Sequence, residues 1–274
     1  MLPPTAAACR LAHTLASLKY PVTIARIVEL SHGFTQQKIP LVLIDHWHPV
    51  TSDLGLVNAP IDVCSNAFIS WHDSIGQRYT RRHASSLERC LELLPPLSNE
   101  KRRIAFLPTA AKNWTALLQS GISGSDPFPV TSMLAARLLK VSGMRVCVSP
   151  GGKEDPAVIW EIYSSPEQEG DSLGFRRTIA VAKDGDRWAF DQSGEPFAFE
   201  RLDRYTLARK RDRFTREMLI AYLAEFGLAP FSDSFYTASE VTPAVVLERI
   251  GRWTNPPPEF TLEQVLAGIP WRRT

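Results

Sequence analysis

The stretch from Ala157 to Phe199 constrains the fold more than any other part of the chain, because it has the pattern of an antiparallel meander. Its short runs are rich in β-branched and aromatic residues, and we expect strands at residues 157–163, 175–182, 187–190 and 196–199. Asp184-Gly185 follows the second run, and Asp-Gly is a strong signal for a hairpin turn. Alternating aromatic residues in the last two runs would form one buried face of this sheet.

The rest of the chain carries signals of both helices and strands. We expect further strands at residues 22–30, 41–45, 67–71, 103–107 and 144–148. We expect helices at residues 6–18, 85–94, 109–120, 132–141, 215–226, 242–252 and 261–267. Residues 49–66 are rich in turn formers and predict a long loop. The order predicts an α+β fold, with a mixed N-terminal half, an antiparallel meander at about 157–199 and C-terminal helices.

The composition is that of an ordinary globular protein. The 274 residues are 44% hydrophobic and 22% charged, which excludes a disordered chain, a coiled coil and a disulfide-built miniprotein. We expect a single α+β domain over residues 1–274, with the Pro- and charge-rich segment 95–102 as the best candidate for an internal boundary. The formal net charge of +2 is too small to indicate a polyanionic partner by itself.

The cysteines and the apolar runs predict the compartment. The four cysteines lie far apart in the sequence, at Cys9, Cys64, Cys90 and Cys147. Without a CxxC pair, they predict free, buried thiols in a reducing compartment. The apolar runs are far shorter than the roughly 18 residues of a membrane span, and the N-terminus lacks the pattern of a signal peptide. We therefore expect a cytoplasmic protein with no membrane anchor.

Six histidines, all before residue 84, suggest a metal site. Asp45-His46-Trp47-His48 follows the apolar run LVLI, and residues two apart on an extended chain point to the same side. This pattern resembles the HxH element that follows a strand in the amidohydrolase family of metal hydrolases. The resemblance implies a metal-dependent hydrolase with His46 and His48 as ligands. His72, followed by Asp73, and His83 are the further histidines that could complete the set. The alternative interpretation is that these are loop histidines bonded to backbone or water, in a protein without a cofactor.

Several motifs of catalysis and phosphate binding are missing from the sequence. There is no GxSxG elbow for a nucleophilic serine and no GxxxxGK[ST] phosphate loop. Gly121 and Gly124 lie between two expected helices, which does not fit a dinucleotide-binding turn. These observations favour a protein that binds over one that catalyses a reaction.

Residues 201–217 form the one basic cluster, with seven basic and three acidic residues. We expect Glu200 to pair with one of the arginines that follow it. The candidate binding residues are Tyr205, Arg209, Arg211, Arg213 and Phe214, because arginine and aromatic side chains dominate protein interfaces. Two other interpretations stay open, a solvated helical face and nucleic-acid binding through residues 201–216.

We therefore hypothesise a non-enzymatic, cytoplasmic protein-binding module whose partner is an acidic protein. With its predicted cytoplasmic location, its α+β pattern and its lack of catalytic motifs, the chain resembles the immunity proteins that neutralise bacterial toxins. That resemblance implies a toxin as the partner. The metal-dependent hydrolase and the nucleic-acid-binding protein are the alternatives, and no membrane partner is expected.

Overall fold

The structure is a computed structural model, and it describes residues 43–149, 156–165, 167, 170–171, 174–251 and 256–269. The helix expected at 6–18, the strand expected at 22–30 and Cys9 lie outside these residues.

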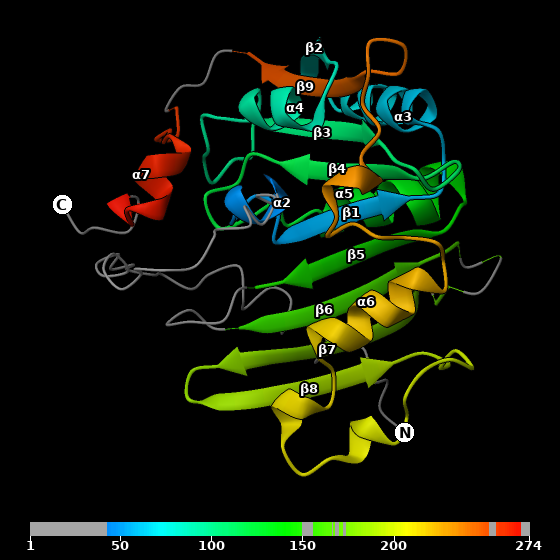
Figure 1. Ribbon diagram of the computed structural model, residues 1–274. Coiled ribbons are helices and arrows are strands. Elements are labelled where there is room, and N and C mark those ends of the chain that lie inside the picture. Colours follow the sequence, from blue (N-terminus) through cyan, green and yellow to red (C-terminus); the bar gives the residue numbers. More distant parts are fainter. Residues whose placement is uncertain are drawn as a thin grey trace, which may run out of the picture.

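Within the described residues, nine strands form one sheet in the order β2-β9-β3-β4-β1-β5-β6-β7-β8 (Figure 1). Every pair of neighbouring strands is antiparallel. The strands are β1 (Asp53–Val57), β2 (Arg78–Ala84), β3 (Arg103–Pro108), β4 (Thr115–Gln119), β5 (Gly143–Val148), β6 (Ala157–Tyr163), β7 (Phe175–Asp184), β8 (Arg187–Ser193) and β9 (Ala244–Ile250). Among the described strands, β2 and β8 are therefore the two at the edges of the sheet.

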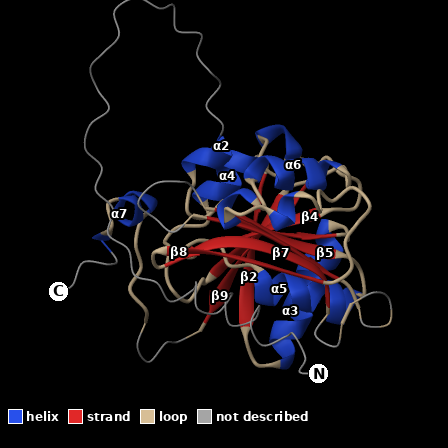
Figure 2. Cartoon of the chain, turned by 90° about the horizontal axis from the view of Figure 1, so that it is seen from below, coloured by secondary structure: helices blue, strands red, loops and turns tan. Residues whose placement is uncertain are grey.

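Helices cover both faces of this sheet (Figure 2). One face carries α2 (Leu43–His46), α4 (Leu87–Glu92) and α6 (Arg216–Ala224), and the other carries α3 (Ile61–Ser74) and α5 (Phe128–Ser132). A π-helical segment, η1 (Met133–Leu139), continues α5. The shorter helices are the 3-10 turns η2 (Arg204–Thr206), η3 (Lys210–Asp212) and η4 (Asp233–Phe235), and the terminal α7 (Leu262–Leu266).

The middle strands are buried on both sides, which explains their continuous apolar sequences. Leu54 and Leu56 of β1 pack in the core on the α4 and α6 face, whereas Val57 packs with Phe68 of α3 on the other face. Every residue of β1 and β4 is buried. Two helical layers over one antiparallel sheet therefore divide the core into two halves.

Local signals in the sequence correctly predict several of these elements. The first three strands of the meander are confirmed as β6, β7 and β8, and the strands at 103–107 and 144–148 as β3 and β5. Ser86 caps α4 by accepting from the backbone N–H of Arg89, and Thr215 caps α6 by accepting from Met218. Thr261 opens α7 with a capping box.

Other predictions were wrong in the type of element. The run at 41–45 is helical from Leu43, the loop expected at 49–66 contains β1 and the start of α3, and residues 67–71 belong to α3. The helix expected at 109–120 is replaced by strand β4, and the helix expected at 242–252 by strand β9. Residues 196–199 form no strand, and the helix expected at 132–141 begins earlier, at Phe128.

The helix predictions at β4 and β9 failed because a short apolar run has the same pattern in a buried helix and in a strand covered on both faces. The overall prediction of helices combined with an antiparallel sheet agrees with the structure. Its C-terminal part differs from the prediction, since β9 lies between helices α6 and α7 and inserts between β2 and β3.

Strands from both sides of residues 95–102 join the same sheet, because β2 pairs with β9. For the whole chain, the single-domain organisation stays a prediction. Among the described helices, none has both the length and the apolar character to cross a membrane.

Candidate functional site

A fully buried ion pair lies beneath the basic cluster. Arg177 of β7 donates from Nε and Nη2 to the two carboxylate oxygens of Glu200, at 2.9 and 2.5 Å, and both side chains are completely buried. Nη1 of Arg177 also donates to Gln192 Oε1 at 2.6 Å and to two backbone carbonyls at the end of β8. Charge and hydrogen-bonding capacity are therefore matched, which a buried ion pair requires.

Glu200 connects this pair to the chain that follows it. Its carboxylate accepts the backbone N–H of Phe197 and the Tyr205 hydroxyl, both at 2.9 Å. Burial, with hydrogen bonding to Tyr222 and the negative charge of Glu200, raises the pKa of Tyr205, so its hydroxyl remains a donor. The Tyr222 hydroxyl in turn accepts the backbone N–H of Arg201 at 2.6 Å. Glu200 thus pairs with Arg177 of β7, and the prediction that it pairs with a following arginine was wrong.

Aromatic rings pack around this anchor. Phe197 and Phe199 stack with 5.2 Å between ring centroids, and both contact Trp160 of β6 and Phe226 beyond α6. Trp160 is fully buried. The predicted aromatic face of the meander thus packs against the core, but its residues Trp188, Phe190, Phe197 and Phe199 are only partly buried, and residues 196–199 reach it from a turn.

We define the basic loop as residues 201–213, which include η2 and η3. The structure places the predicted binding residues of this segment in two different environments. Tyr205 is 7% exposed and Phe214, directly after the loop, is fully buried, so both rings belong to the core and offer no surface for a partner. Arg213 is half-buried, with its guanidinium 5.3 Å from the centroid of the Phe190 ring and its Nε donating to the Leu207 carbonyl.

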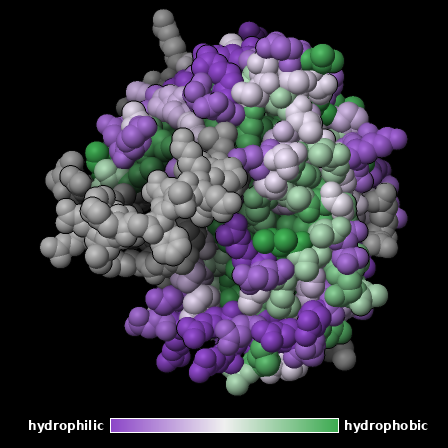
Figure 3. Space-filling model, viewed as in Figure 1, coloured by the Kyte–Doolittle hydropathy of each residue, from purple (hydrophilic) through white to green (hydrophobic). Residues whose placement is uncertain are grey.

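Apart from Arg201, which pairs with Asp203 at 3.1 Å, the exposed cations of the basic loop lie around η3. Arg209, Lys210 and Arg211 are exposed, and Arg211 makes a loose 3.7 Å contact with Asp212. Within the described part of the chain, neither Arg209 nor Lys210 forms an ion pair through its side chain. Figure 3 shows hydrophilic residues gathered along the lower edge of the molecule, where Figure 1 places β8 and the basic loop. This segment has no α-helical face, contrary to one of the interpretations above.

The histidines do not assemble as the HxH pattern suggests. His46 ends helix α2, so the chain is not extended there, and Nδ1 of His48 contacts the Ser52 hydroxyl. His72 lies on α3, which covers the opposite face of the sheet from α2 (Figure 2). Among the described residues, no three His, Cys, Asp or Glu side chains are close enough to hold a metal ion. The sheet therefore separates His72 from His46 and His48.

The three described cysteines are free and buried, as predicted. Burial raises the pKa of the Cys64 and Cys90 thiols to about 12, and it raises the pKa of Cys147 as well. These groups therefore stay protonated near neutral pH and are poor nucleophiles.

A second buried ionic cluster, on the α5 face, was missed in the sequence. Arg145 of β5 donates to both carboxylate oxygens of Asp53, at 3.0 and 2.6 Å, and its Nη1 lies 3.5 Å from Glu161. The Tyr163 hydroxyl donates to Glu161 at 2.5 Å. Burial raises the pKa of Asp53 against the opposing effect of Arg145. Strand register brings these residues together. Arg145 is paired with Glu161 of β6 on one side and with Gly55 of β1 on the other, and Asp53 lies two residues before Gly55, on the same face of the strand.

Sequence reasoning also missed a cleft on the same face of the sheet, next to β2. His72 lines it together with Tyr79 of β2 and Arg249 of β9. Tyr79 and Arg249 are opposite each other in the β2–β9 register although they are far apart in the sequence. No local motif marks such a pair.

Comparisons with protein-family models, with curated proteins and with solved structures found no match. The arrangement of side chains therefore carries the functional argument.

Proposed function

We propose that this protein is a non-enzymatic binding module that engages an acidic partner protein through the basic loop. The observation that carries the proposal is the combination of exposed Arg209, Lys210 and Arg211 with the buried Arg177–Glu200 pair that anchors the start of the loop. A loop held in one conformation before binding loses less conformational entropy on association. Exposed arginines then supply charge-assisted hydrogen bonds to carboxylates.

The buried anchor supports this proposal because burying two charged side chains costs desolvation free energy. A buried ion pair often stabilises no better than apolar side chains of similar volume, and it can serve to specify one conformation. Here the specified conformation is that of residues 197–205, through the bonds of Glu200 to Phe197 and Tyr205. We infer that the role of the anchor is to fix the conformation of the chain where the basic loop begins.

We further propose that the partner is a toxin and that the protein acts in the cytoplasm. A protein that covers an acidic surface of a toxin neutralises it by binding alone, so this role needs no catalytic group. The nucleic-acid-binding and hydrolase hypotheses become alternative outcomes of the test.

The test uses affinity capture with the immobilised full-length protein, followed by purification of the captured protein and calorimetric measurement of its Kd. We expect an acidic protein to bind with defined stoichiometry. The double variant Arg209→Glu/Lys210→Glu should weaken binding at least tenfold, because close like charges oppose association.

The matched control is Arg78→Glu/Lys112→Glu, which changes the net charge equally at exposed residues outside the basic loop. It should leave the affinity unchanged within about twofold, since long-range charge effects are screened by salt. Equal weakening by both double variants would contradict the proposal. So would the absence of a stoichiometric protein partner, capture of nuclease-sensitive material in its place, or substrate turnover by the purified protein.

A further inference from the structure

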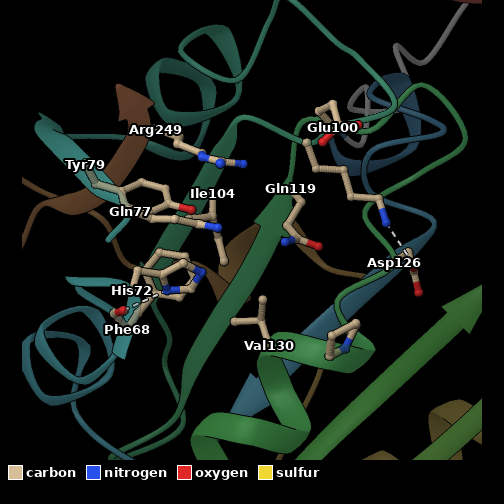
Figure 4. Close-up of a pocket in the computed structure, with 12 residues that line it drawn as sticks. Phe68, His72, Gln77, Tyr79, Glu100, Ile104, Gln119, Asp126, Val130 and Arg249 are labelled. Carbon is tan, nitrogen blue, oxygen red and sulfur yellow. Dashed lines mark hydrogen bonds and ion pairs between the residues drawn. The ribbon is translucent and has the colours of Figure 1, made fainter. Parts of the chain in front are cut away.

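A cleft of about 230 Å³ opens where α3 ends and α5 begins, on the face of the sheet formed by β2, β9, β3 and β4 (Figure 4). Most of the residues that line it are polar. A water molecule takes up about 30 Å³ of the liquid, so the cleft has the volume of about seven or eight waters. Its size therefore suits a small polar ligand built on one ring.

The buried ring of His72 presents a hydrogen-bond acceptor to this cleft. His72 is 8% exposed, and its Nδ1 donates to the Phe68 carbonyl at 2.9 Å. Burial lowers the pKa of His72, so the imidazole is neutral at pH 7 and Nε2 is an acceptor. Figure 4 shows this second nitrogen facing the cavity, and no described residue forms a hydrogen bond with it. A ligand that fills the cleft must therefore bring a donor for Nε2.

Two side chains close to His72 add polar groups of both kinds. Within the described part of the chain, the Tyr79 hydroxyl and the side-chain amide of Gln77 form no hydrogen bonds, and Figure 4 shows both directed toward the cavity. Burial raises the pKa of Tyr79, so its hydroxyl stays protonated and can donate. The Gln77 amide offers a donor and an acceptor. One side of the cleft thus presents a mixture of donors and acceptors.

The charged groups of the cleft balance one another. Lys101 pairs with Asp126 at 2.7 Å, and Arg249 already interacts with another group of the protein. Glu100, which is exposed, adds a second carboxylate to the lining, whereas neutral His72 adds no charge. The lining therefore has no net charge, and it favours a neutral ligand over an ion of either sign.

From these observations we propose that the cleft binds a small neutral polyol, such as a monosaccharide ring. A hydroxyl group both donates and accepts, so neighbouring hydroxyls on one ring match the acceptor of His72, the donor of Tyr79 and the amide of Gln77. The inference is independent of the proposed function, because the cleft and the Arg177–Glu200 anchor lie at opposite ends of the sheet.

The first test compares rings that differ in their number of hydroxyl groups. In NMR titrations of the unmodified full-length protein with glucose, galactose, mannose, ribose and myo-inositol, we expect at least one polyol to shift the backbone signals of residues that line the cleft, with a millimolar Kd. Tetrahydropyran-2-methanol keeps a ring but has one hydroxyl, so it should bind at least about tenfold more weakly. No shift with any of the five polyols at tens of millimolar would overturn the proposal, and so would equal binding of the hydroxyl-poor ring.

The second test adds charge to the ring that binds. The amino sugar and the uronic acid derived from that ring should both bind more weakly than the neutral form, because neither finds an unbalanced charge in the cleft. Tighter binding of either ion would contradict the charge balance on which the proposal depends.

Two variants assign the contacts. Tyr79→Phe removes the donor and His72→Phe removes the acceptor, and both keep an aromatic ring, so each should weaken binding of the polyol about three- to tenfold, the effect of one lost hydrogen bond. The matched control Thr80→Val removes a hydroxyl from the opposite face of β2 and should leave the Kd unchanged. Equal weakening by Tyr79→Phe and Thr80→Val, or an unchanged Kd in both cleft variants, would contradict the assigned geometry.

Discussion

Charged side chains form a completely buried ion pair at one end of the sheet and partly exposed ion pairs at the other. Near β8, Arg177 and Glu200 are completely buried and hydrogen-bonded to each other. At the β2 end, Glu248 of β9 bonds Arg103 at 2.6 Å and Arg82 at 3.0 Å, and the Arg82 side chain is 55% exposed. Exposed charges on β2 also protect an edge strand from pairing with another chain.

The comparison separates two uses of arginine in one fold. The buried arginine fixes the conformation of a loop that lies outside the sheet, because Glu200 reaches both Arg177 and the loop residue Tyr205. The exposed arginines of β2 keep an edge strand solvated. On the neighbouring strand β9, Arg249 lines a cleft. Stability should therefore depend on charge at the β8 end far more than at the β2 end.

The largest expected effect comes from removing the buried cation. Arg177→Met leaves Glu200 charged and buried without its partner, which should cost about 3–5 kcal/mol of unfolding free energy. Arg82→Met breaks an exposed pair and should cost less than about 1 kcal/mol. Urea unfolding followed by circular dichroism measures both.

A double variant checks the cause of that loss. Arg177→Met/Glu200→Gln removes the uncompensated charge as well, so it should recover part of the stability lost in Arg177→Met. If the two arginine variants destabilise equally, the contrast between the two ends of the sheet is wrong.

An intermediate effect is expected at Glu248. Burial alone would raise the pKa of Glu248, but the hydrogen bond and charge of Arg103, with the charges of Arg82 and Arg102, lower it below the ordinary 4.5. The ionised group therefore contributes stability that is present above pH 4.5 and lost as the pH falls through the lowered pKa. Acid titration of the unfolding free energy should show a shallower loss in Glu248→Gln than in the unmodified protein, and parallel curves would refute the role of this carboxylate.

The smallest expected effect is the titration of His72 at the β2 end. Its pKa in the folded protein lies below the ordinary 6.5, so the unfolded chain takes up the proton first as the pH falls. The stability from neutral His72 is complete above pH 6.5 and decreases from there until the folded protein is also protonated. Between pH 8 and 5, the unfolding free energy should therefore depend less on pH in His72→Gln than in the unmodified protein. The same pH dependence in both proteins would show that His72 is not buried as a neutral ring.

Turn and capping signals account for much of what could be predicted from the sequence. Asp184 and Gly185 predict the β7–β8 hairpin, and Gly185 adopts a positive φ of 57° there. Thr215 and Thr261 begin helices at the expected positions. The predictions of binding residues were less accurate. Tyr205 and Phe214 are of residue types that are common at protein interfaces, but both are buried in the core.

By itself, the sequence determined the β7–β8 hairpin and several capped helix ends, since those depend on backbone conformations and hydrogen bonds within a few residues. The tertiary structure alone decided that β4 and β9 are strands, that Glu200 pairs with Arg177, and that Arg249 meets Tyr79 and His72 in one cleft. Each of these depends on which strands become neighbours. That choice is set by burying both faces of a sheet at once, and no short stretch of sequence carries the information.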